Sequence, residues 1–272
     1  MRAELELWVR AVIGRAYPRI VGATREKSWL FFDTVLPLLG TAAYVFVYRA
    51  IGAPEAYIGF VVVGGAMTAF WMNVLWSMSS QLYWEKESGN LGLYIAAPAP
   101  MMAILLGMAV GGLFYTSLRA TAVILVGSLL FGVHYALGDF GLLLLTFFLT
   151  MAALYGMGML FASLYLLWGR EAWHISNLLQ EPVYLLSGFY FPVRHLGFWV
   201  AVAASFIPLT LGLDAMRQLL FPVEPTLGFL SVPVEVGALA GLSVLFIVAA
   251  RYALEYLERL AKREGRLTER RG

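Results

Sequence analysis

The sequence predicts an all-α integral membrane protein with six transmembrane helices. Its 272 residues are 61% hydrophobic and only 13% charged, whereas a soluble domain carries roughly 25% charged residues. Apolar runs long enough to cross a bilayer, which takes about 20 residues, recur along the whole chain. The connections between these runs are too short to hold a soluble domain. We therefore expect residues 1–272 to form a single transmembrane domain.

Residues 1–29 are predicted to form an amphipathic helix that lies in the membrane interface. Arg2, Glu6 and Arg10 recur every four residues, and apolar side chains recur at helical spacing on the opposite face. That apolar face consists of Leu5, Trp8, Val9, Val12, Ile13 and Ala16. The alternative is a solvated basic tail.

Five of the six predicted spans are continuous apolar runs. They are Leu30–Tyr48, Tyr57–Gln81, Met101–Phe131, Phe140–Trp168 and Val232–Ala250. The third is long enough to tilt strongly or to bend at Gly111–Gly112. Residues 251–272 are predicted to continue the last helix into water, where their basic side chains contact anionic lipid or a cytoplasmic partner, or simply face solvent.

The fifth span is predicted to be broken. Residues Glu181–Phe221 are too long for one crossing, and they are interrupted by Gly188, Pro192, Gly197, Pro208 and Gly212. Backbone that leaves the helix at membrane depth must be buried in protein or line a wet cavity, because lipid satisfies none of its polar groups. We therefore expect one helix followed by short re-entrant pieces over residues 188–221, which together act as a gate.

The basic residues predict the orientation. With the N-terminus inside, 15 of the 19 Lys and Arg residues fall on the cytoplasmic side, and only Arg49, Arg194 and Arg217 fall outside. Cytoplasmic segments of membrane proteins carry such an excess of positive charge. Both termini are therefore predicted to be cytoplasmic, in the cytoplasmic membrane of a bacterium or an archaeon.

The connection Trp84–Pro100 is the most distinctive of the predicted cytoplasmic segments. It opens with Glu85-Lys86-Glu87, turns at Gly89, continues as a short apolar run and closes at Pro98 and Pro100. We interpret it as a short amphipathic helix parallel to the membrane, which suits docking into a groove on a soluble partner. The alternative is an ordinary solvated loop.

Catalytic and metal sites are not predicted. The chain has no Cys, and none of its three Lys residues follows a Gly, so a phosphate-binding P-loop cannot be built. His134, His174 and His195 are too far apart in sequence for a helical zinc motif. Ser187 and His195 flank the broken span, but His195 is expected near the outer surface, away from a buried nucleophile.

Two polar side chains fall within predicted spans. A charge at the bilayer centre costs at least about 2.5–3.5 kcal/mol, so Arg119 in the third span either faces an internal cavity or pairs with a carboxylate such as Asp33 or Glu181. If the span starts later, Arg119 instead snorkels to the surface. Asn73 in the second span either lines a pathway or bonds a neighbouring helix.

The sequence resembles the permease subunits of the ABC type-2 exporter family. These permeases commonly show Glu-x-Glu, a Gly and a short helix ending in Pro between the second and third spans, and a Leu-Ser-Gly–aromatic–Pro pattern in the fifth. A Trp-containing run, Pro-Leu-Thr and an Arg follow in that region. Here these are Glu85-Lys86-Glu87, Gly89, Pro98, Leu186-Ser187-Gly188-Phe189-Tyr190-Phe191-Pro192, Trp199, Pro208-Leu209-Thr210 and Arg217. The likeness covers essentially the whole chain.

Two positions depart from the family pattern. Gly197 stands where a Pro is common, which alters the expected outer turn. Asn90-Leu91-Gly92 stands where Thr-Leu-Glu is frequent, so one carboxylate of the expected docking helix is missing.

The resemblance implies a division of labour. Two permeases pair across the membrane and recruit two ATPase subunits, which bind the ATP and Mg²⁺; this chain itself binds no cofactor. The coupling helix to the ATPase would use Glu85, Lys86, Glu87, Gly89 and Pro98. The outer gate would use Leu186, Ser187, Gly188, Pro192, Pro208 and Arg217. The translocation path would be lined by Trp71, Asn73, Trp76, Arg119, Tyr184 and Phe189.

The resulting hypothesis is the membrane subunit of an ATP-driven exporter for a hydrophobic or amphipathic compound, such as a drug or a lipid-like molecule. Its expected partners are an ABC ATPase subunit, a second permease copy and membrane lipid, with no role for nucleic acid. One alternative is export of a lipid-linked polysaccharide or lipo-oligosaccharide. Others are an integral-membrane enzyme acting on lipid and a passive channel, neither of which needs an ATPase.

Overall fold

The structure is a computed structural model that describes residues 2–25, 27–136, 138–168, 171–222 and 227–264. All regular elements among these residues are helical, which confirms the predicted all-α class. In chain order they are α1 (Arg2–Arg25), α2 (Lys27–Ala50), α3 (Glu55–Met72), the π-helix η1 (Asn73–Met78), α4 (Gln81–Glu87), α5 (Leu91–Ala96), α6 (Met101–Phe131), α7 (Phe140–Trp168), α8 (Glu171–Leu186), the 3₁₀-helix η2 (Val193–Leu196), α9 (Phe198–Ala204), α10 (Pro208–Leu220) and α11 (Val232–Glu264).

The long helices confirm the predicted membrane class. Within the described chain, five helical stretches are long and apolar enough to cross a membrane, and a sixth is reached if the bent pair α9–α10 is one broken span. Helices α6 and α7 begin and end at the residues predicted for the third and fourth spans. α6 runs without interruption through Gly111–Gly112. Its left-handed C-cap, Gly132 (φ 71°), ends it where the apolar run ends.

The fifth span differs from its predicted bounds. Helix α8 begins at Glu171, ten residues before the predicted start at Glu181, because residues 171–180 are amphipathic and escape a search for continuous apolar sequence. The predicted breaks at Gly188 (φ 68°) and Gly197 (φ 84°) are present, and Pro208 starts α10. Gly212, however, lies inside α10, where an added Cβ would sit 2.2 Å from Thr150 Oγ1. It is a packing glycine and does not break the helix.

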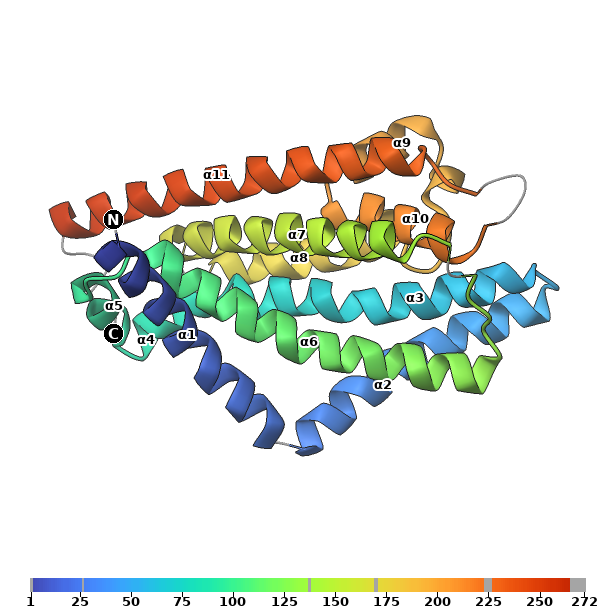
Figure 1. Cartoon of the computed structure of the whole chain (residues 1–272), viewed down its shortest axis with the longest axis horizontal. Coiled ribbons are helices and arrows are strands. Elements are labelled where there is room, and N and C mark those ends of the chain that lie inside the picture. The colour runs from blue at the N-terminus through green and yellow to red at the C-terminus, as the bar shows by residue number, and fades with distance from the viewer. Residues whose placement is uncertain (1, 26, 137, 169–170, 223–226, 265–272) are drawn as a thin grey trace.

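Helices α9 and α10 occupy the region that was predicted to be re-entrant, and they form a sharply bent pair. The two axes are bent by 111° at a break of a few residues. Figure 1 shows both at the end of the molecule toward which α8 runs, with α11 returning from there to the opposite end. We name the end that contains α9 and the α2–α3 turn (residues 51–54) the α9 end. The opposite end, with α4, α5, the start of α1 and the end of α11, is the α5 end.

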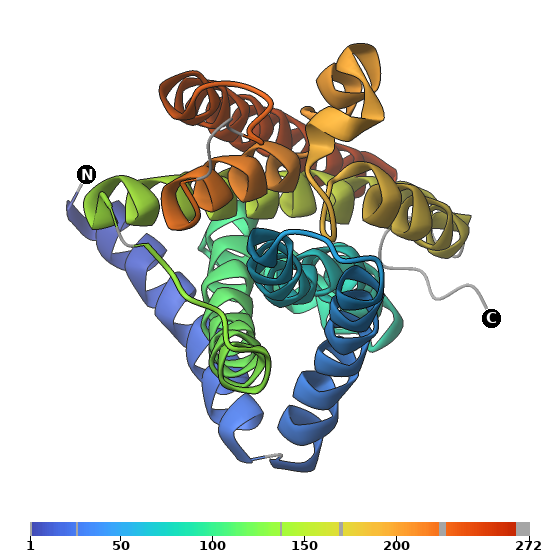
Figure 2. The ribbon, with the colours of Figure 1, turned by 90° about the vertical axis from the view of Figure 1, so that its right-hand side faces the viewer.

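Helix α1 is packed more closely than an interfacial helix requires. It slants across α6 (Figures 1 and 2). An added Cβ at Gly107 would lie 2.6 Å from Val12 O, and one at Gly111 would lie 3.2 Å from Ala16 O. This Gly-x-x-x-Gly pair therefore lets the two backbones approach, as in transmembrane helix pairs.

The predicted apolar face of α1 is only partly buried. Ala16 is buried against α6, but Leu5, Val9 and Ile13 are exposed and available to lipid. Arg15 points toward the bundle, because α1 also packs on polar groups of the second span. For the predicted segments at the chain ends, residues 1, 26 and 265–272 lie outside the described residues.

Helix α3 forms the centre of the bundle. In its apolar window 89% of residues are buried, compared with 11% for α2 and 17% for α11. It packs against α2, α6 and α10, while α7 and α11 pack along each other. Seen from the α9 end, α3 is enclosed by its neighbours and α11 lies on the periphery (Figure 2). The outer helices therefore present their apolar faces to lipid, as the hydrophobic composition predicts.

Candidate functional site

A cavity of about 730 Å³ lies between α2, the α3–η1–α4 rod, α6 and α8, and it is open on one side. Among the described residues of its wall, only Asp33 and Arg119 are charged; the rest are polar, aromatic or apolar. Its lining is Asp33, Leu36, Pro37, Gly40, Thr68, Ala69, Met72, Asn73, Trp76, Ser77, Ser80, Gln81, Trp84, Arg119, Tyr184 and Tyr190. Such a wall combines hydrogen-bonding groups with flat apolar surface.

Four of the six predicted path residues meet at this cavity: Asn73, Trp76, Arg119 and Tyr184. The other two do not line it. Trp71 is buried at 1% exposure in the core, on a different face of α3 from Ala69 and Met72. Phe189 is fully buried behind the wall, with its ring centroid 5.3 Å from that of Tyr184. Sequence spacing alone did not distinguish the side of α3 that lines the cavity from the side that packs in the core.

Arg119 forms an ion pair across the cavity wall. Its Nη1 lies 3.2 Å from Asp33 Oδ2, and its Nη2 donates to Asp33 O at 2.9 Å. The hydroxyl of Tyr115 also donates to Asp33 Oδ2, at 3.2 Å. Arg119 therefore lines the cavity and pairs with Asp33, one of the two carboxylates that the sequence offered as partners.

Asn73 and Trp76 both bond neighbouring helices and line the cavity. Asn73 Oδ1 accepts a hydrogen bond from Tyr155 of α7 at 3.1 Å. Trp76 Nε1 donates to Gln180 Oε1 of α8 at 2.8 Å. Asn73 thus bonds a neighbouring helix, as one of its two predicted roles requires, and its side chain also lines the cavity. Tyr155 and Gln180 were missed, because only the fold brings them beside the second span.

The predicted coupling segment is divided differently from the expectation. Trp84–Glu87 still belongs to α4, the end of the second span; the helix breaks around Gly89 (φ 81°), and α5 is only six residues long. Lys86 is half-buried, and Glu87 and Pro98 are exposed. The carboxylates therefore close the second span and do not open a separate helix.

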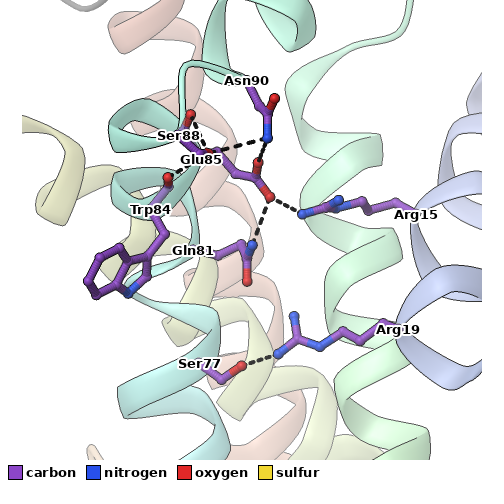
Figure 3. A network of polar contacts seen from close by, with 8 residues as sticks. All are labelled: Arg15, Arg19, Ser77, Gln81, Trp84, Glu85, Ser88 and Asn90. Carbon is purple, nitrogen blue, oxygen red and sulfur yellow. Dashed lines mark hydrogen bonds and ion pairs between the residues drawn. The ribbon is translucent and has the colours of Figure 1, made fainter. Parts of the chain in front are cut away.

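Glu85 faces inward and is 6% exposed (Figure 3). Its carboxylate accepts from Arg15 of α1, from Gln81 Nε2 at 2.9 Å and from Asn90 Nδ2 at 3.2 Å. Charge-assisted bonds of this kind are about twice as strong as neutral ones. Glu85 therefore joins α1, α4 and the start of α5, and it is not available on the surface for docking.

Tyr94 of α5 completes this network. Arg15 Cζ lies 5.4 Å from the centroid of the Tyr94 ring. Burial raises the pKa of Tyr94, and Arg15 opposes that rise. Tyr94 thus contacts the same guanidinium that pairs with Glu85.

Arg217 fastens the turn that follows α8. It is 3% exposed, and its guanidinium donates to three carbonyls of that turn: Gly188 O at 2.5 Å, Phe189 O at 2.6 Å and Phe191 O at 3.5 Å. It also donates to Phe60 O of α3 at 2.7 Å. Helix C-termini leave carbonyls without partners, and a guanidinium satisfies several at once.

The remaining predicted gate residues lie around this turn. Ser187 and Pro192 are buried, and Leu186 packs with Val193, Ala201 and Ala204 of a small separate core. Pro208 is buried at the first turn of α10. Leu186, Ser187, Gly188 and Pro192 thus lie at the turn whose carbonyls Arg217 binds, whereas Pro208 lies at the other end of α10.

A second polar tie joins α10 to α11. Gln218 Nε2 donates to Asp214 Oδ2 and to Glu235 Oε2, both at 3.2 Å, and Phe229 N donates to Asp214 Oδ2 at 2.6 Å. Asp214 is 4% exposed and Glu235 is fully buried. This tie connects the re-entrant pair to the last helix. Sequence reasoning missed it, because carboxylates on two different helices carry no spacing signal.

Comparison with known proteins agrees with this architecture. The family model described as "ABC-2 type transporter" matches residues 19–221, which is most of the chain and includes the cavity, α5 and the re-entrant region. A comparison with curated proteins finds no match. Over the described residues, no group of three or more His, Cys, Asp or Glu side chains has a metal-binding arrangement. The chain therefore belongs to the ABC-2 type transporter family, whose permeases are transmembrane subunits that work with an ABC ATPase.

Proposed function

We propose that this chain is the membrane subunit of an ATP-driven exporter, and that a separate ATPase subunit binds the ATP and Mg²⁺. The observation that carries the proposal is the cavity of about 730 Å³, which is walled by four residues predicted to line the path in a chain of this family. The polar network of Glu85 at the α5 end joins α1, α4 and α5. Such a rigid connection suits a transporter that an ATPase drives, whereas a passive channel has no need of it.

The proposed substrate is a hydrophobic or amphipathic compound, taken from the cytoplasm or the inner leaflet. The two charges in the cavity wall, Asp33 and Arg119, bind each other, so the wall offers no unbalanced charge to a strongly anionic ligand. Trp76, Trp84 and Tyr184 supply flat apolar surface with polar edges. This combination favours a neutral or zwitterionic amphiphile.

A second copy of the chain is the proposed partner at the open side of the cavity. Leu36 and Leu39 of α2 are 65% and 61% exposed, and Leu36 also lines the cavity. A homodimer would bring two such cavities together into one path, and lipid would cover the remaining apolar surface.

The α5 end is the proposed docking site for the ATPase. Glu87 and Leu93 are exposed there, which gives a partner one carboxylate and one apolar side chain. This end would face the cytoplasm of a bacterial or archaeal cell, consistent with the predicted excess of basic residues on that side.

The test is to purify the chain from its native membrane and identify what co-purifies. We expect an ABC ATPase in equal amount, with ATP hydrolysis that a neutral amphiphile stimulates. Glu87→Lys should release the ATPase, whereas Glu55→Lys, at an exposed carboxylate of the α9 end, should retain it. A chain that purifies alone and shows no nucleotide-dependent activity would contradict the proposal.

The substrate class is tested separately in vesicles that contain the complex. ATP-dependent movement of a neutral amphiphilic dye would support the proposed class. Movement of a lipid-linked oligosaccharide without movement of the dye would instead assign the chain to polysaccharide export.

A further inference from the structure

The second span contains a π-helix at the level of the cavity. η1 spans Asn73–Met78 between α3 and α4, and Ser79 N bonds to Val74 O at its end, five residues back. A π turn holds one residue more than an α turn of the same rise, and such turns are frequent at functional sites. The widened turn here lies in the most deeply buried rod of the bundle.

Three side chains of η1 reach three different helices. Asn73 bonds Tyr155 of α7, Trp76 bonds Gln180 of α8, and Ser77 accepts from Arg19 of α1. All three also line the cavity. A change in the backbone of η1 would therefore move the cavity wall and its contacts with α1, α7 and α8 together.

The neighbouring helices leave space for the wide turn. An added Cβ at Gly112 of α6 would lie 2.8 Å from Asn73 Oδ1. One at Gly158 of α7 would lie 2.8 Å from Val74 Cγ1 and 3.2 Å from Met78 Cγ. Glycines thus stand where η1 bulges toward α6 and α7, so the packing is adapted to the π conformation.

The same rod is fastened to α1 on both sides of its break at Ser79–Ser80. Arg19 holds Ser77 before the break, and Arg15, one turn earlier on α1, holds Glu85 after it (Figure 3). Each residue rotates an α-helix by about 100°. If η1 became α-helical, α4 would turn by about that angle relative to α3, and Glu85 would leave Arg15.

We propose that η1 couples the α5 end to the cavity, with Asn73, Trp76 and Ser77 as positioning residues for the cavity wall. A push on α4 and α5 would strain the Arg15–Glu85 contact and shift the π turn, which repositions the three side chains at once. In this proposal the turn changes between a π and an α conformation, and that change is the two-state element that coupling between sites requires. The proposal rests on the proposed function, since the push comes from the ATPase.

The experiment measures ATP hydrolysis and substrate transport separately, on the complex in proteoliposomes. Ser77→Ala should lower the substrate moved per ATP by roughly three- to tenfold, because it removes the contact between η1 and Arg19 of α1; thermal stability is measured on the same samples. The control is Ser163→Ala, a buried serine of α7 whose hydroxyl bonds Met159 O of its own helix; it should change none of these values. An unchanged ratio in Ser77→Ala would overturn the inference.

Two further measurements separate a failure of the coupling role from a failure of the proposed function. Arg15→Glu and Glu85→Arg should each lower the transport ratio, and the double variant should restore much of it. Hydrogen exchange of the amides of residues 73–79 should change when the complex is trapped with ATP and vanadate; unchanged exchange would overturn the coupling role alone. A chain that recruits no ATPase would overturn the proposed function and this inference together.

Discussion

Arg119 and Arg217 each place a guanidinium among apolar helices, and different partners stabilise them. Arg119 meets a carboxylate at the cavity, and Arg217 meets backbone carbonyls in a closed site. The sequence singled out both, because a charge within an apolar run is costly wherever it lies. It named Asp33 as one partner of Arg119. It gave no sign of the carbonyls around Arg217, since backbone groups carry no sequence identity.

Arg119→Leu should destabilise the protein, because it leaves the partly buried Asp33 carboxylate without its cation. We expect a loss of about 2 kcal/mol, below the value for fully buried pairs, since solvent reaches part of this one. The double variant Asp33→Leu/Arg119→Leu should recover most of the loss. Thermal unfolding in detergent measures both; equal stability of the single variant and the parent would mean that the pair contributes nothing.

Gly64→Ala tests how closely α3 and the turn after α8 approach. The added Cβ would lie 1.5 Å from Phe189 O and 2.6 Å from Arg217 Nη2, so one of the two segments must move. Overpacking of this kind costs up to about 3 kcal/mol. Gly237→Ala in α11, with no atom within 4 Å, should instead be neutral or slightly stabilising. Thermal unfolding of the two variants, compared with the parent, gives the difference.

At the scale of elements, prediction succeeded where hydropathy changes abruptly. The bounds of α6 and α7 follow from apolar runs that end at polar or glycine residues. The start of α8 was missed because an amphipathic helix has no continuous apolar run. The π-helix was missed because the space around it is left by Gly112 and Gly158, which only the fold brings beside the second span. Glu85 was expected at the surface, since its partner Arg15 lies 70 residues away.

The turn after α8 should open more often when the hydrogen bonds from the Arg217 guanidinium are weakened. Arg217→Lys keeps the charge, but an ammonium lacks the planar fork that reaches Gly188 O, Phe189 O and Phe60 O together. In the naturally cysteine-free chain, Ser187→Cys provides a buried reporter. A soluble maleimide should label this cysteine about tenfold faster when Arg217→Lys is also present, if one net hydrogen bond is lost.

Ser231→Cys, at an exposed position, is the control and should react at the same rate with or without Arg217→Lys. If the rate at position 187 is also unchanged, the guanidinium does not hold the turn closed.

On the scale of the whole molecule, the start of α1, the α4–α5 connection and the end of α11 share one end. The α2–α3 turn and α9 share the other. The predicted six crossings require the first of these coincidences, because an even number of crossings brings the two ends of the chain to the same side. Composition and hydropathy were sufficient for this level, because the bilayer imposes a single direction on every long apolar helix.

Single cysteines should report this polarity. At Glu6 and Ser88 they should resist a membrane-impermeant maleimide in intact cells and react after the membrane is opened. At Ala53 or Ser231 they should react in intact cells, because the α9 end is predicted to face outward. Labelling in the reverse pattern would invert the orientation while leaving the fold unchanged.

Helix α11 has 33 residues and is therefore about 50 Å long. The hydrocarbon core of a bilayer is only about 30 Å thick. The helix is thus roughly 20 Å longer than the apolar core is thick, and its residues after the candidate span, which ends at Leu257, extend past that span at the α5 end. An ATPase that docks at the α5 end, as proposed above, would therefore have to fit against the side of this projecting helix, whose length would limit the shapes that can approach.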